Sequence, residues 1–234
     1  MTTIDTNLQQ LQQRIARACA TTQRPADSVQ LLAVSKTCTA DAVAQAVAAG
    51  QRQFGENYIQ EGVEKIQALA SHPLRAALVW HCIGPVQGNK TRLVAEHFDW
   101  VQTVDRLKIA QRLSEQRPAH LPPLQVCLQV NLDGGANKSG LAPADVRALA
   151  QAVAALPGLR LRGLMCIPEP TSDFDGQKAL FTSARALFDS LKDCSPQWDT
   201  LSMGMSDDLE AAIAAGSTLV RVGRAVFGER PPKP

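Results

Sequence analysis

The 234-residue sequence has few aromatic residues, no excess of charge of one sign and no long apolar run. Aromatic residues make up 4% of the chain, and the formal net charge is +2. Proteins that bind nucleic acid need clustered cations and stacking surfaces, so this composition argues against such a partner. The N-terminus lacks a basic start followed by an apolar segment, and the apolar runs are too short to span a membrane. We therefore expect a cytoplasmic protein whose partner is a small molecule.

Paired cysteines and clustered histidines are also lacking. The six cysteines include no C-x-x-C pair, and several stand in apolar runs, so we expect reduced core thiols. The four histidines stand apart from one another, and no metal site is predicted. Since no flexible linker divides the chain, we expect one domain over 1–234, with an N-terminal helix and linker at 1–25 and a tail at 229–234.

Apolar segments of strand length alternate along the chain with segments of helical periodicity. An amphipathic segment at 5–20 comes first and predicts a helix on the side or the bottom of the fold. The predicted strands are 31–36, 52–56, 78–83, 100–104, 124–131, 159–167, 200–205 and 218–222. The predicted helices that follow the first seven strands are 40–49, 58–70, 89–96, 106–117, 144–155, 176–191 and 207–215.

Eight strands alternating with helices predict an α/β fold, a single (β/α)8 barrel of the TIM type. A doubly wound open sheet is the alternative. It is disfavoured because no G-x-G-x-x-G follows the first strand, where a dinucleotide-binding fold carries that motif. In a barrel, the C-terminal ends of the strands carry the chemistry.

Lys36 stands at such an end, because it closes the first apolar run. Partial burial disfavours an ammonium group, so a lysine in this position can act as a nucleophile toward a carbonyl. The alternative is a lysine whose stem covers apolar surface while its amine reaches water.

Small residues occupy the loops after the seventh and eighth strands, where barrels often bind phosphate. Gly204, Gly223 and Gly228 would let the backbone approach an anion, and Ser206 could add a hydroxyl. Ordinary turn chemistry is the alternative, with Ser206 as the N-cap of the next helix. Alternation along the last strand places Arg221 in the lumen, unless it is a surface arginine. An amine, an arginine and a phosphate site together suit pyridoxal 5′-phosphate (PLP).

Seven motifs stand in one order along nearly the whole chain: LLAVSK (31–36), FGENYIQE (54–61), WHCIGPVQGNK (80–90), NKSG (137–140), GLMCIP (163–168), LSMGMSDD (201–208) and RVGRAVFG (221–228). Together they resemble the family of pyridoxal phosphate homeostasis proteins. The H-x-I-G-x-x-Q-x-N-K and S-M-G-M-S-x-D patterns are the most specific of them. The resemblance implies a barrel similar to the N-terminal domain of alanine racemase, with PLP as its cofactor.

The resemblance also implies roles for individual residues. Lys36 would hold PLP as a Schiff base, and Arg221 would be the partner of the pyridine nitrogen. The other implied PLP-binding residues are Ser206, Gly223 and Arg224 at the phosphate and Asn57, His81, Met165 and Met203 around the cofactor. Arg224 departs from the family, which usually has a small hydroxyl residue there, although a guanidinium also binds phosphate. Lys138 matches a family lysine that would form a second, weaker adduct, or it is a solvated loop lysine.

The same residues bear on whether the protein is an enzyme. Barrel-type racemases place a tyrosine from a second domain opposite the lysine, whereas the only tyrosine here, Tyr58, follows the second strand and no second domain is expected. The guanidinium of Arg221 can only donate, which leaves the cofactor a poor electron sink. We predict a monomeric, non-catalytic carrier that transfers PLP by transimination to apoenzymes or amines. A low-activity amino-acid racemase or lyase is the alternative, and a barrel for another phosphorylated metabolite is a third.

Overall fold

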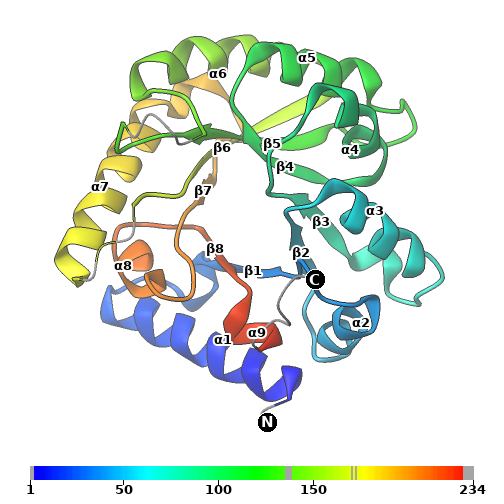
Figure 1. Cartoon of the computed structure of the whole chain (residues 1–234). Helices are drawn as coiled ribbons and strands as arrows, with labels where there is room; N and C mark the ends of the chain where they lie inside the picture. The colour runs from blue at the N-terminus through cyan, green and yellow to red at the C-terminus, as the bar shows by residue number, and fades with distance from the viewer. Residues whose placement is uncertain (1–2, 135–138, 170, 172, 229–234) are drawn as a thin grey trace.

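Eight parallel strands form a closed barrel, in which each strand pairs with the next and β8 pairs with β1 (Figure 1). The computed structural model describes residues 3–134, 139–169, 171 and 173–228. The strands are β1 (Gln30–Val34), β2 (Gln53–Glu56), β3 (Val79–Cys82), β4 (Trp100–Val104), β5 (Leu124–Val130), β6 (Leu159–Cys166), β7 (Thr200–Ser202) and β8 (Leu219–Val222). The predicted barrel is confirmed, and the open sheet is excluded because β1 and β8 are hydrogen-bonded neighbours.

Helices surround the barrel, and one follows each strand. They are α1 (Ile4–Thr21), α2 (Ala40–Ala48), α3 (Ile59–Ala68), α4 (Thr91–His97), α5 (Leu107–Gln116), α6 (Val146–Ala154), α7 (Phe174–Ser190), α8 (Leu209–Ala214) and α9 (Arg224–Phe227). Short 3-10 turns occupy Ala26–Ser28, Arg75–Ala77, Gly88–Lys90, Pro143–Asp145 and Lys192–Cys194. The helix α9 was not predicted, because a single turn is too short to show helical periodicity. The predicted tail at 229–234 lies outside the described residues.

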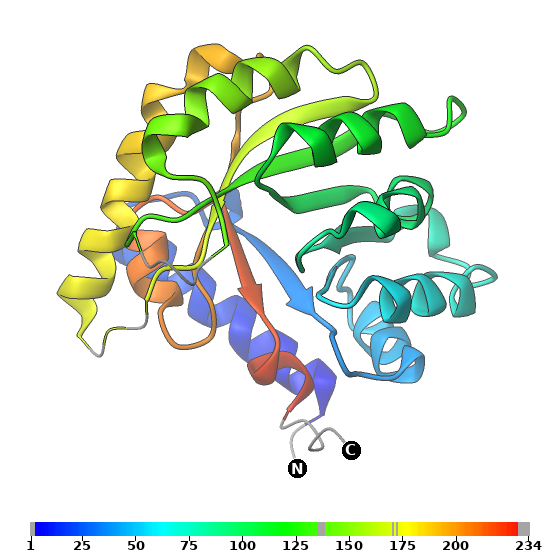
Figure 2. The same ribbon diagram turned by 45° about the horizontal axis from the view of Figure 1, so that its top comes forward.

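The helix α1 packs against the side of the barrel and contacts α2, α8 and α9 (Figure 2). Its buried face carries Leu8, Leu11 and Ile15 at helical spacing, as the amphipathic pattern predicts. Because β8 is followed only by the four-residue α9, α1 fills the remaining place in the outer ring of helices.

Alternation along the strands separates the barrel wall into an inner and an outer face. Leu32 and Val34 form a small apolar cluster in the lumen with Ile83 and Leu219. Ala33, between Leu32 and Val34, belongs to the large core between the strands and the helices. The same alternation on β8 turns Arg221 to the same side as Leu219, which is the lumen side that the sequence pattern predicts.

Three further features concern membrane-spanning helices, metal sites and cysteines. In the described part of the chain, no helix has the length and apolarity needed to cross a membrane. Within the same residues, no three His, Cys, Asp or Glu side chains gather as a metal ion would require. Four of the six cysteines are buried and the other two are half-buried.

Candidate functional site

A pocket of about 250 Å³ lies at the C-terminal end of the barrel. The strands are parallel, so their following loops all meet at this end. The pocket is lined by Val34, Lys36, Asn57, Ile83, Ile167, Met205, Ser206, Asp207, Arg221, Gly223 and Arg224. We call this cavity the Lys36 pocket.

Six of the nine residues predicted to bind a cofactor line the Lys36 pocket: Lys36, Asn57, Ser206, Arg221, Gly223 and Arg224. The other three, His81, Met165 and Met203, are fully buried and do not line it. Their cofactor contacts, like those of the first six, stay predictions. Lys138, the predicted second lysine, lies outside the described residues.

Lys36 stands two residues beyond the end of β1, so the predicted strand ended two residues too late. Its side chain is half-buried in the wall of the pocket. The chain then turns into α2, whose first turn is capped by Thr39, with Oγ1 accepting from the Ala42 N–H at 3.2 Å. Lys36 therefore lies between the end of a strand and a capped helix.

The loop after β7 carries Ser206 to the pocket, but not as an N-cap. Asp208 folds back so that its Oδ1 accepts from the Met205 N–H at 2.5 Å, and α8 begins only at Leu209. The predicted capping role of Ser206 is therefore wrong. Gly204, the second residue of this loop, has φ +95°, and a Cβ there would lie 2.5 Å from the Ala212 side chain, so glycine is required.

Arg221 lies within the barrel, and the alternative of a surface arginine is wrong. Its side chain is 5% exposed. Nη1 donates to Ser202 Oγ at 2.7 Å, and Nη2 donates to the Cys166 carbonyl at 2.9 Å. Burial lowers the pKa of Arg221, yet a guanidinium remains a donor and never accepts. Burial also raises the pKa of the Cys166 thiol to about 12, so that thiol stays neutral beside the guanidinium.

A line of buried hydrogen bonds continues from Arg221 across the lumen. Ser202 Oγ donates to Gln102 Oε1 at 2.7 Å, and Gln102 Nε2 lies 3.0 Å from His81 Nδ1. An amide nitrogen only donates, so His81 Nδ1 accepts. Burial lowers the pKa of His81 to about 3, which keeps the ring neutral against the stacked ring of Trp100. This line, which we call the lumen relay, fixes the guanidinium of Arg221.

Asn57 presents a buried acceptor at the pocket. Its Oδ1 has no hydrogen-bond partner among the described residues. The carbonyl of Asn57 packs directly against Gly84, where a Cβ would lie 1.9 Å from that oxygen. Only glycine permits this approach, so the loop after β3 helps to place Asn57.

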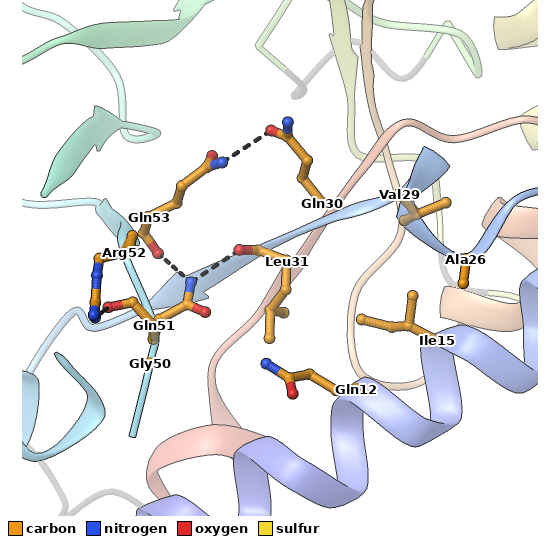
Figure 3. Close-up of a pocket in the computed structure, with 10 residues that line it drawn as sticks. All are labelled: Gln12, Ile15, Ala26, Val29, Gln30, Leu31, Gly50, Gln51, Arg52 and Gln53. Carbon is orange, nitrogen blue, oxygen red and sulfur yellow. Dashed lines mark hydrogen bonds between the residues drawn. The ribbon is translucent and has the colours of Figure 1, made fainter. Parts of the chain in front are cut away.

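A second cavity, of about 320 Å³, lies at the opposite end of the barrel, between α1 and the starts of β1 and β2 (Figure 3). Apart from Gln12, its polar side chains already bind one another or the backbone. Gln51 Nε2 donates to the Leu31 carbonyl at 2.9 Å, and Gln53 Nε2 donates to Gln30 Oε1 at 2.9 Å (Figure 3). With most of these groups satisfied and no lysine among the described residues that line it, this cavity is a weaker candidate than the Lys36 pocket.

Comparisons with known proteins agree with the motifs. A family model described as "Alanine racemase, N-terminal domain" matches residues 6–231. The chain is 59% identical over 230 residues to the pyridoxal phosphate homeostasis protein of Pseudomonas aeruginosa, covering 98% of this chain and 97% of that protein. It is 56% identical over 230 residues to the protein of the same name from Vibrio cholerae, covering 98% of each. A solved structure of PipY from Synechococcus elongatus with PLP bound has a TM-score of 0.79 at 41% identity, covering 92% of this chain and 100% of that one.

The buried His81 predicts a pH dependence of stability. Its folded pKa of about 3 lies below its ordinary value of 6.5, so the unfolded chain binds the proton first as the pH falls. The stabilisation is therefore complete above about pH 6.5 and is lost as the pH falls from there toward 3. From this group alone, we expect the free energy of unfolding to be about 2 kcal/mol lower at pH 5 than at pH 7.

Urea unfolding at pH 5, 6 and 7 measures this difference. His81→Asn keeps an acceptor for Gln102 but cannot take up the proton, so it should lose this part of the pH dependence. The other three histidines are present in both proteins and form a common background. Identical pH dependence in the two proteins would show that His81 is not held neutral by burial.

Proposed function

The chain belongs to the family of pyridoxal phosphate homeostasis proteins, and from this premise we propose that it carries PLP on Lys36 and passes it to cytoplasmic apoenzymes. One observation supports this proposal above all. The Lys36 pocket brings together an amine, a buried guanidinium and a loop pair suited to phosphate. PLP itself is the ligand that the solved PipY structure contains.

The residues of the pocket fit this cofactor group by group. Lys36 offers an amine to the aldehyde, and Arg221 offers a donor to the pyridine nitrogen. In this proposal Ser206, Gly223 and Arg224, which line the pocket, bind the phosphate, and the exposed guanidinium of Arg224 replaces the usual hydroxyl. The buried Oδ1 of Asn57, which lacks a partner among the described residues, offers an acceptor to a donor on the ligand. All these groups come from one chain, which supports a monomeric carrier.

PLP supplies a reactive aldehyde, and Lys36 supplies the group that holds it. Condensation of the Lys36 amine with the aldehyde forms a carbon–nitrogen double bond and releases one water. In transimination, an incoming amine adds to that bond and Lys36 leaves as the free amine. Attachment and release thus need neither an oxidant nor a reductant.

Two features of the pocket favour a carrier over a racemase or lyase. Because Arg221 only donates, it would leave the pyridine nitrogen unprotonated and weaken the electron sink that carbanion chemistry needs. A racemase also needs acid–base groups on both faces of its substrate. Among the described residues, the lining of the Lys36 pocket contains no tyrosine, histidine or cysteine; besides Lys36 and two arginines, its one ionisable group is Asp207. Tyr58 is 44% exposed and does not line the pocket.

Lys36→Ala is expected to abolish covalent attachment of the cofactor. After loading with PLP and reduction with borohydride, mass spectrometry of the wild-type protein should find pyridoxyl phosphate on the peptide that contains Lys36. The matched control is Lys90→Ala, since Lys90 follows β3 at the same end of the barrel but does not line the pocket. Equal labelling of the Lys36→Ala protein would refute the proposed tether.

Arg224→Ala tests the phosphate contact separately. We expect PLP to bind about three- to tenfold more weakly, because one partly solvated charged contact is lost. Pyridoxal, which lacks the phosphate, should bind this variant and the wild type equally. Absorbance titrations with both ligands measure the effect, with Arg106→Ala as a control at an exposed arginine outside the pocket. If both ligands are weakened alike, Arg224 does not act through the phosphate.

A further inference from the structure

Three charged side chains lie behind Lys36, between α3 and the ends of β1 and β2. The ammonium of Lys65 donates to Glu56 Oε1 at 2.8 Å and to Glu61 Oε1 at 2.6 Å. It also donates to the backbone carbonyl of Ser35 at 2.6 Å. Lys65 is 5% exposed and Glu56 is fully buried. We call Glu56, Glu61 and Lys65 the backbone clamp.

The backbone clamp holds the peptide groups on both sides of Lys36. The carbonyl of Ser35 belongs to the peptide group that precedes the Lys36 Cα, and this carbonyl accepts from the Lys65 ammonium. The N–H of Thr37 belongs to the peptide group that follows the Lys36 Cα, and this N–H donates to Glu61 Oε1. Each peptide group is planar, so the orientations of these two groups set both backbone torsions of Lys36. They thereby set the direction in which its side chain leaves the backbone.

The turn after Lys36 needs such support. Thr37 has φ +62°, a left-handed conformation that is disfavoured for a β-branched residue. Its hydroxyl donates to the Lys36 carbonyl at 2.6 Å, which adds a second hold on the same peptide group. Strained torsions of this kind persist only where the surroundings impose them, and they concentrate at functional sites.

The backbone clamp acts from behind the strand and lies outside the pocket. None of its three residues lines the Lys36 pocket. Ser35 points toward the clamp and donates from its hydroxyl to Glu56 Oε1 at 2.6 Å. Lys36, the next residue, lines the pocket on the other side of the backbone. Glu56, Glu61 and Lys65 therefore act on Lys36 through the main chain that they hold, and not through a contact in the pocket.

Lys65 is itself unsuited to hold a cofactor. An ammonium has three hydrogens, and here three acceptors take them. Burial raises the pKa of Glu56, while the adjacent Lys65 opposes that rise. Lys65 thus has no hydrogen left to donate, whereas Lys36 faces the pocket.

We propose that Glu61 and Lys65 are positioning residues, which orient the backbone so that the Lys36 amine faces the pocket. In this proposal, the hydrogen bond from Thr37 to Glu61 controls how fast Lys36 attaches PLP. The inference rests on the proposed function, because the rate in question is that of PLP attachment to Lys36.

Glu61 is the better residue to change. Removal of Lys65 would leave the buried Glu56 unpaired and endanger the fold, whereas the side chain of Glu61 is 27% exposed. We expect Glu61→Ala to slow attachment about tenfold or more, because small misplacements of a reacting group are costly. Glu61→Gln keeps an acceptor for the Thr37 N–H and should recover most of the rate. Glu64→Ala removes the same charge from an exposed site on α3 and should leave the rate unchanged.

Stopped-flow absorbance after mixing with PLP measures the rate, and thermal unfolding confirms that each variant is folded. Amide hydrogen exchange of Thr37, followed by NMR without cofactor, reports on the clamp directly. It should be faster in Glu61→Ala than in the wild type and slow again in Glu61→Gln. Attachment at the wild-type rate in Glu61→Ala, or equal slowing in the Ala and Gln variants, would overturn the proposal. A wild-type protein that never attaches PLP would count against the proposed function, while the Thr37 exchange would still decide whether the clamp exists.

Discussion

A buried ammonium group, that of Lys65, constrains the part of the barrel from which Lys36 extends. A charge taken out of water is costly unless it is paired and fully hydrogen-bonded, and Lys65 meets three acceptors. Those acceptors belong to β2, to α3 and to the residue before Lys36, so one charge ties a helix to the ends of two strands. An apolar residue in its place would leave the Ser35 carbonyl and the buried Glu56 without this donor. The geometry at Lys36 thus depends on a contact outside the pocket.

A second buried cation faces the pocket from the lumen. Arg221 lies on β8, which pairs with β1 so that Leu32 stands beside it in register. The lumen relay runs from Arg221 through Ser202 and Gln102 and ends on a neutral His81. In each of its hydrogen bonds, the chemistry of the groups fixes which is the donor and which is the acceptor. A guanidinium fixed in this way is a rigid donor. In the proposed function, this rigid donor suits a site that holds PLP without protonating its pyridine nitrogen.

Much of this arrangement follows from local patterns. The alternation of apolar segments predicts the closed barrel, and alternation within β8 predicts that Arg221 faces the lumen. Local patterns did not predict the contacts between side chains that are far apart in the sequence. In the sequence, Gln102 is one polar residue within a strand, and nothing near it indicates Ser202 or His81 as its partners.

Ser206 likewise has the residue type of an N-cap. The carboxylate of Asp208 instead accepts from the Met205 amide, and the helix begins later than predicted. Glu61 and Lys65 stand four residues apart on α3, but this spacing gives no sign that the pair reaches both peptide groups beside Lys36.

Carrier and enzyme differ most directly in the fate of an amino acid's α-proton. The PLP-loaded protein can be incubated with L-alanine in D2O while NMR follows the α-proton and absorbance follows the cofactor on Lys36. A carrier should lose its cofactor to the added amine while the α-proton remains in place. Replacement of the α-proton by deuterium, at a rate that Lys36→Ala abolishes, would contradict the carrier function and identify a catalyst.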